Sequence, residues 1–135
     1  MNTKLKILSP RRTLDAFGAG HYGASRGSRI HKGIDFAAWP NSMLLSPVAG
    51  KVTKLGYPYA DDQHFRYVEI TDEANLRHRF FYVFPSVAFG ETIEINDHLG
   101  TVQDLRPRYP DITPHIHYEI KDEDNLPIDP DQFWG

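Results

Sequence analysis

The stretch Pro114-His115-Ile116-His117-Tyr118-Glu119-Ile120 alternates polar side chains that can bind a metal with apolar ones. This period of two is typical of a β-strand, in which successive side chains point to opposite faces of the sheet. One face is therefore predicted to carry the functional side chains, and the other face is predicted to pack in a hydrophobic core. The polar face would consist of His115, His117 and Glu119, and the apolar face of Ile116, Tyr118 and Ile120.

The polar face of this strand has the spacing of a metal site. Alternate residues of a strand lie roughly 7 Å apart at their backbones, so His115 and His117 can serve one metal ion, or one metal ion and its bound water. The chain has seven His and no Cys. Disulfides and thiolate zinc clusters are therefore excluded, and His and carboxylate side chains are the only strong metal ligands available.

Length and composition indicate the fold class. A chain of 135 residues fits one domain and can bury its own core. Ten Gly, ten Pro and 13% aromatic residues favour short strands joined by turns. We expect an all-β fold, a single antiparallel β-sheet or sandwich domain with long loops. The expected strands before residue 114 are 43–45, 50–55, 65–71, 77–84, 92–95 and 100–102, with 65–71 and 77–84 forming a hairpin.

Charge and hydropathy exclude several classes of partner. The formal charge of −3 comes from 15 basic and 18 acidic residues spread along the chain, which does not fit a nucleic-acid footprint or a basic membrane patch. The apolar run within residues 1–10 is too short for a signal-peptide core or a membrane span. We therefore expect no nucleic-acid partner, no membrane span and no signal peptide, with synthesis in the cytoplasm.

A second group of candidate ligands lies near the start of the chain. In Ile30-His31-Lys32-Gly33-Ile34-Asp35-Phe36, Gly33 and the β-formers around it disfavour a helix, so His31 and Asp35 are expected to flank a turn that enters a strand. A catalytic zinc site needs three protein ligands and one open position. His31, Asp35 and one of the two His of the later strand supply that set. If all four bind the metal, the site is closed and structural, and the spacing leaves both readings open.

These segments together resemble the lysostaphin-type (LytM-like) family of zinc metallopeptidases, which act on bacterial peptidoglycan. The resemblance rests on 31–35, on Ser46-Pro47-Val48-Ala49-Gly50-Lys51-Val52, on the stretch 114–120, and on Pro127-Ile128-Asp129-Pro130, which is similar to the family's usual ending. It implies a zinc site in a groove across the sheet. We expect the peptidase domain at 17–135, after an N-terminal extension at 1–16.

The resemblance also implies roles for single residues. His31, Asp35 and His117 become the zinc ligands, and His115 becomes a catalytic acid/base beside them. One position departs from the family, because Phe84 stands where a second catalytic His is expected, two residues after a Tyr. A phenyl ring cannot transfer a proton, and general acid/base groups typically contribute about 10²–10⁴-fold to the rate.

The function expected from the resemblance is that of a zinc-dependent endopeptidase that hydrolyses peptide bonds in peptidoglycan. Its partners would be stem or cross-bridge peptides, and we expect it to act as a monomer at the bacterial cell wall. The alternative is a catalytically impaired zinc-binding member that serves as a cell-wall or protein binding module. A single domain without a leader favours an endolysin-like enzyme encoded by a phage or prophage.

Overall fold

The computed structural model describes residues 25–26, 29–30, 33–130 and 133. Apart from a few residues near the C-terminus, its regular elements are short strands, which the Gly- and Pro-punctuated sequence favours. The strands are β1 Ser25–Arg26, β2 Arg29–Ile30, β3 Ile34–Ala37, β4 Met43–Leu45, β5 Gly50–Gly56, β6 Tyr67–Thr71, β7 Arg77–Phe81, β8 Val83–Pro85, β9 Thr92–Ile93, β10 His98–Val102, β11 His115–Lys121 and β12 Pro127–Ile128.

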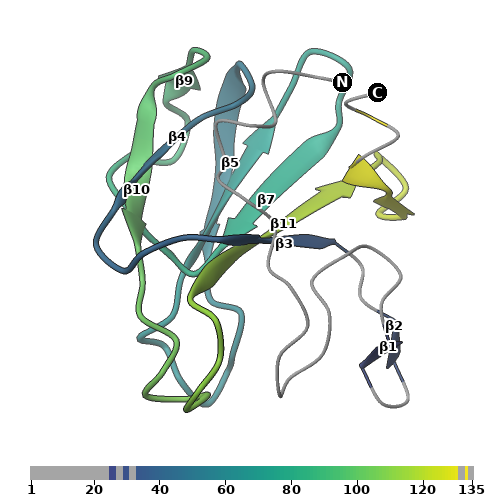
Figure 1. Ribbon diagram of the computed structural model, residues 1–135. Helices are drawn as coiled ribbons and strands as arrows, with labels where there is room; N and C mark the ends of the chain where they lie inside the picture. Colours follow the sequence, from purple (N-terminus) through teal and green to yellow (C-terminus); the bar gives the residue numbers. More distant parts are fainter. Residues whose placement is uncertain (1–24, 27–28, 31–32, 131–132, 134–135) are drawn as a thin grey trace.

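The strands form antiparallel sheets (Figure 1). The large sheet has the order β12-β11-β7-β6-β5-β9, and β3 joins it by pairing with β11. The small sheet has the order β4-β10-β8, and β1 pairs with β2. The predicted all-β antiparallel fold is confirmed.

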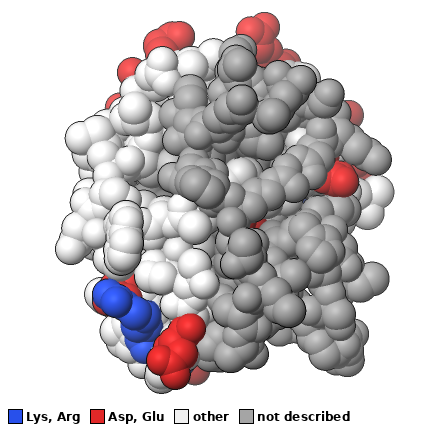
Figure 2. All heavy atoms as spheres, viewed as in Figure 1, with Lys and Arg blue, Asp and Glu red and all other residues white. Residues whose placement is uncertain are grey.

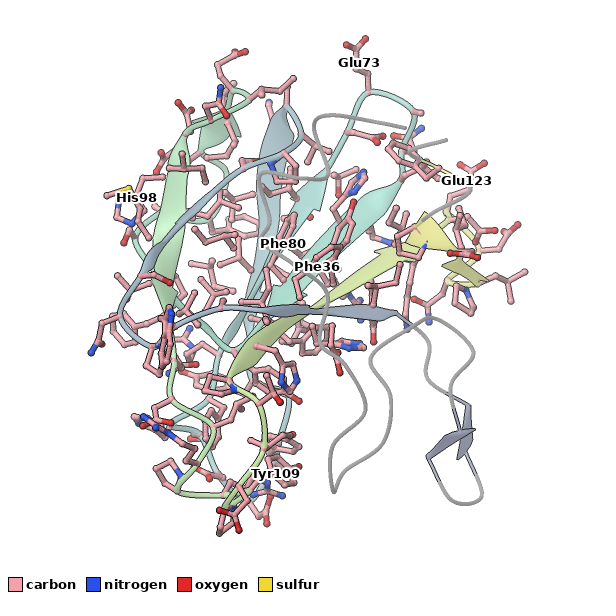
Figure 3. The ribbon with its side chains drawn as sticks, in the orientation of Figure 1. Phe36, Glu73, Phe80, His98, Tyr109 and Glu123 are labelled. Carbon is pink, nitrogen blue, oxygen red and sulfur yellow. The ribbon has the colours of Figure 1, made fainter. Side chains whose placement is uncertain are left out.

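The main core lies between the large and the small sheet. Phe36 and Phe80 project into this space (Figure 3) and are both buried. The small sheet contributes Leu44, Val83, Leu99 and Val102 to the same cluster, and the large sheet contributes Val52, Val68, Ile70, Ile116, Tyr118 and Ile120 among others. The predicted apolar face of the strand at 114–120 is therefore confirmed, since its three residues are fully buried.

The predicted hairpin is confirmed, but its second strand is shorter than expected. β6 pairs with β7 across the turn at 72–76, where the Asp72 carboxylate accepts the backbone N–H groups of Ala74 and Leu76. The strand expected at 77–84 ends at Phe81. Tyr82 has a φ of 71°, which breaks the extended backbone, and the chain then enters β8 in the small sheet. Phe84 therefore pairs with Thr101 of β10 and does not belong to the large sheet.

The remaining boundaries differ from prediction by a few residues. β9 ends at residue 93, two residues earlier than expected, and β10 begins two residues earlier than expected. The predicted division between 1–16 and 17–135 lies outside the described residues. No helix in the described part of the chain is long and apolar enough to span a membrane. In Figure 2, uncharged side chains cover most of the described surface on this face, with a few Lys, Arg, Asp and Glu at its margins.

Candidate metal centre and active site

β11 brings the predicted site residues into one place. It pairs with β3 along one edge and with β7 along the other (Figure 1). The register sets His117 opposite both Asp35 of β3 and Phe81 of β7. His117 and Asp35 are 82 residues apart in the chain, so it is the sheet that makes them neighbours.

The carboxylate of Asp35 lies between the two imidazoles of β11. Its Oδ1 is 2.8 Å from Nδ1 of His117, and its Oδ2 is 3.6 Å from Nε2 of His115. Asp35 is only 2% exposed. A carboxylate this deeply buried requires cationic or hydrogen-bonding partners. Two such partners, His115 and His117, come from β11.

His117 faces a carboxylate at each ring nitrogen. Nδ1 bonds to Asp35, and Nε2 lies 3.1 Å from Oε1 of Glu119. Burial alone lowers the pKa of His117, but the hydrogen bonds and charges of the two carboxylates outweigh burial and raise this pKa to about 9. Burial raises the pKa of Glu119, while its hydrogen bond to His117 has the opposite effect, and the net pKa is lowered. Without metal, an imidazolium therefore lies between two carboxylates.

His115 is held in a defined tautomer. Its Nδ1 is 2.7 Å from the carbonyl oxygen of Thr113, and because a carbonyl can only accept, Nδ1 carries the proton. Nε2 is the nitrogen that faces Asp35. In the neutral ring, the lone pair that can accept a proton is therefore on Nε2, which is the requirement for a base at this position.

Three of the predicted site residues are thus brought together, namely Asp35, His115 and His117. His31 lies outside the described residues. Phe84 is 56% exposed in β8, and within the described part of the chain no ring contact joins it to either imidazole. The residue that packs against His115 is Tyr82, whose ring centroid is 5.6 Å from that of the imidazole.

Two residues of the site were not assigned a role from the sequence. Glu119 lies on the predicted polar face, and its spacing of two residues from His117 is the signal that pointed to this contact. Tyr82 carries no such signal, because its contact with His115 depends on a backbone conformation that no pattern of residue types encodes.

The described residues fit part of a zinc site. Oδ1 of Asp35 and Nδ1 of His117 converge at 2.8 Å. Two ligands of a tetrahedral zinc are roughly 3.3 Å apart, so the pair needs to open by only about half an ångström once the Nδ1 proton has left. Among the described residues, no group of three or more His, Asp or Glu is arranged to hold a metal. The donor chemistry fits zinc, with His31 as the third ligand that the sequence predicts.

Replacing Glu119 with Gln is expected to weaken zinc binding by about 10–100-fold, the usual effect of losing the outer partner of a ligating His. Glu119 accepts a hydrogen bond from Nε2–H of His117, which would leave Nδ1 as the nitrogen that binds a metal. Calorimetric titration with zinc at fixed pH measures the affinity. Glu73→Gln, in the exposed turn before β7 (Figure 3), is the matched control. An unchanged affinity for Glu119→Gln would contradict this role.

Comparisons with known proteins identify the family of the chain. Residues 29–130 match the sequence profile of Peptidase family M23. The mouse (Mus musculus) protein leukocyte cell-derived chemotaxin-2 is 32% identical over 113 residues, which cover 80% of this chain and 71% of that protein.

Solved structures share the fold. The antimicrobial peptidase lysostaphin from Staphylococcus simulans superposes with a TM-score of 0.71 at 16% identity over 96% of this chain, and the chain spans only half (50%) of that structure's length. The catalytic domain of the prophage-encoded M23 protein EnpA from Enterococcus faecalis superposes with a TM-score of 0.68 at 18% identity, over 95% of this chain and 98% of that one. The profile match covers more than half of the chain, and the chain therefore belongs to peptidase family M23.

Proposed function

We propose that the protein is a zinc-dependent endopeptidase that hydrolyses peptide bonds in bacterial peptidoglycan. The observation that carries the proposal is the buried Asp35 carboxylate, which meets a nitrogen of each imidazole of β11 at 2.8 Å and 3.6 Å. One imidazole is thereby suited to hold a metal together with Asp35. The other, that of His115, is suited to transfer protons beside it.

Asp35 and His117 would hold the zinc through Oδ1 and Nδ1, with His31 as the third ligand. The bound zinc supplies a Lewis acid and a water whose pKa falls to about 7 in favourable sites. Glu119 keeps the Nε2 proton of His117 in place, which orients the ring.

His115 would act as the general acid/base. Its Nδ1–H stays hydrogen-bonded to the Thr113 carbonyl, so the proton that the ring takes from the attacking water is accepted at Nε2. The protonated ring is stabilised by the Asp35 carboxylate 3.6 Å away. It then returns this proton to the leaving amine nitrogen of the cleaved peptide bond.

The proposal is tested by incubating the zinc-loaded protein with purified peptidoglycan or muropeptides and measuring newly exposed amines. His117→Ala is the control, because it removes one of the proposed ligands. Amine release well above this control is expected. Release equal to the control would contradict the endopeptidase proposal.

A second candidate is a binding module that retains zinc without catalysis. It is favoured by Phe84, which cannot transfer a proton, and by the 32% identical mouse relative, whose name describes a chemotaxin. Such a module would bind zinc and sediment with cell walls or capture a protein partner. It would release no amines in the assay above, so one experiment separates the two candidates.

Phe84→His is expected to raise the turnover number about tenfold or more, since a positioned imidazole typically contributes about 10²–10⁴-fold and this one would not be optimised. Phe84 comes only a few positions after Phe81 and Tyr82, the two aromatic residues that contact the imidazoles of the site. The turnover number of the zinc-loaded variant on muropeptides checks it. Phe89→His, at another exposed Phe, is the control. Equal rates for both variants would count against a site role for position 84.

We also propose that the enzyme acts at the bacterial cell wall as a monomer, with the domain at 17–135. The prophage origin of the EnpA domain, which has the same fold, supports a phage or prophage source for this chain. Co-sedimentation of the protein with purified cell walls, compared with heat-treated protein, tests the site of action.

A further inference from the structure

Tyr82 has a backbone conformation that is unusual for its residue type. Its φ is 71°. The other non-glycine residues with positive φ in the described ranges are all Asn or Asp, at positions 41, 75, 96, 111 and 125. Asn and Asp enter this region readily because their short polar side chains bond locally, whereas a bulky aromatic residue there is a genuine outlier. A residue kept in a disfavoured conformation calls for an explanation in terms of its side chain.

The turn itself does not explain a tyrosine. Backbone bonds shape this turn, since the N–H groups of Tyr82 and Val83 both donate to the carbonyl of Arg66, at 2.8 and 3.2 Å, and the N–H of Gln103 donates to the carbonyl of Tyr82. None of these bonds involves the phenol. An Asn at position 82 could make them all with less backbone strain.

The conformation changes the face on which the side chain lies. In a regular strand, consecutive residues point to opposite faces, so Tyr82 would follow Phe80 into the core. Instead Phe81 and Tyr82 both contact the site. The ring of Phe81 lies 5.3 Å from that of His117, and the ring of Tyr82 lies 5.6 Å from that of His115. Each imidazole of β11 thus has its own aromatic neighbour.

The hydroxyl of Tyr82 belongs to a chain of hydrogen-bonded phenol groups. Its hydroxyl is 2.9 Å from that of Tyr59, which in turn accepts a hydrogen bond of 2.7 Å from the hydroxyl of Tyr109. The guanidinium of Arg108 lies 3.8 Å above the ring of Tyr59. These rings pack on the second hydrophobic cluster, formed by Phe65, Leu105 and Ile112. Tyr109 marks the outer end of this chain in Figure 3.

The phenol chain holds Tyr82 through neutral hydroxyl groups. Burial, the neighbouring phenols and their hydrogen bonds raise the pKa of Tyr59, so its hydroxyl stays protonated at neutral pH. A neutral hydroxyl in the middle of the chain can hold its neighbours by hydrogen bonds. It cannot serve as a base.

We propose that Tyr82 is a positioning residue that fixes the imidazole of His115, and that the hydroxyls of Tyr59 and Tyr109 fix Tyr82. The hydrogen bond to Thr113 directs Nδ1 of His115, and the perpendicular Tyr82 ring, at an interplanar angle of 89°, packs against the imidazole. The two contacts together direct Nε2 toward Asp35. This inference deepens the proposed peptidase function and, for its kinetic part, rests on it.

The decisive variant is Tyr82→Asn, which suits the positive φ and removes the ring. We expect the kcat for muropeptide hydrolysis to fall about 10–100-fold with the KM within about twofold, as for a displaced catalytic group. Tyr82→Phe keeps the ring but loses the hydroxyl bond to Tyr59, so its kcat should lie between that of the unchanged protein and that of Tyr82→Asn. A kcat for Tyr82→Asn equal to that of the unchanged protein would overturn the proposal.

A readout without metal or substrate separates this inference from the proposed function. In ¹⁵N-resolved NMR of the metal-free protein, the ring signals of His115 should shift or broaden in Tyr82→Asn, and should change less in Tyr82→Phe, which loses only the hydroxyl bond to Tyr59. Tyr82→Leu, which preserves apolar packing, should behave like Tyr82→Asn and serves if the latter does not fold. Unperturbed His115 signals in a folded Asn or Leu variant would overturn the positioning role. If the unchanged protein were inactive but the Tyr82 variants still showed these changes in the His115 signals, only the peptidase function would be contradicted.

Discussion

Replacing Asp35 with Asn is expected to weaken zinc binding by well over 100-fold and to reduce peptidoglycan hydrolysis to the level of His117→Ala. Loss of an outer partner alone costs about 10–100-fold in affinity, and in the proposed coordination Asp35 is itself a ligand. Its Oδ1 and Oδ2 also face the two imidazoles of β11, so a neutral amide removes the charge that both of them share. Zinc titration and amine release measure the two effects.

The matched control is Asp124→Asn, because Asp124 lies in the exposed turn that follows β11 and has the same side chain. It should change neither zinc affinity nor hydrolysis. If Asp35→Asn bound zinc with an affinity close to that of the unchanged protein, Asp35 would not be a ligand, and the proposed coordination would be wrong. Loss of hydrolysis with zinc binding retained would instead confine Asp35 to a role in orienting His115.

The alternation of residues 115–120 correctly predicts both faces of β11, because a half-buried strand imposes a period of two on its side chains. The hairpin of β6 and β7 is predictable for a similar local reason, since polar turn residues separate two β-rich runs. The contact between Asp35 and His117 cannot be predicted in this way, because it depends on the pairing of two strands and joins residues 82 positions apart in the chain. Zinc donor chemistry grouped Asp35 with one of the two His of β11, and the resemblance to a known family selected His117 before the structure did.

The error at residues 82–84 has a specific physical origin. Phe80, Phe81, Tyr82, Val83 and Phe84 are all good β-formers, so propensity extends the strand through them. The positive φ of Tyr82 ends β7 and sends the chain into the small sheet. Residue types give no sign of it, because Tyr is a rare choice for that region of φ/ψ space. Local sequence patterns therefore give no indication that Tyr82 supports His115.

His78→Ala is expected to lower the free energy of unfolding by roughly 2–4 kcal/mol at pH 8, through a cavity and lost hydrogen bonds. His78 is fully buried on the core face of β7. Its Nε2 is 2.8 Å from Oδ2 of Asp72 and its Nδ1 is 2.7 Å from the hydroxyl of Tyr118. A neutral ring satisfies both contacts, since Nε2–H donates to the carboxylate and Nδ1 accepts from the hydroxyl. Denaturant unfolding measures the change, and His98→Ala, on the exposed side of β10 (Figure 3), should cost less than about 1 kcal/mol.

The loss in free energy of unfolding caused by His78→Ala should also depend on pH, because burial of the ring changes the pKa of His78. Burial lowers the pKa of His78 below 6.5, although the hydrogen bond and charge of Asp72 act in the opposite direction. Below pH 6.5 the unfolded chain binds a proton that the folded chain does not, so the stabilisation by His78 is complete above this pH and decreases as the pH falls, by at most about 1.4 kcal/mol per pH unit. The difference between the unchanged protein and His78→Ala should therefore shrink from pH 7 toward pH 5. A difference that stays constant over this range would mean that the buried ring keeps its ordinary pKa. Asp72→Asn removes the charge that favours the protonated ring, lowers the pKa of His78 further, and should extend the decline to lower pH.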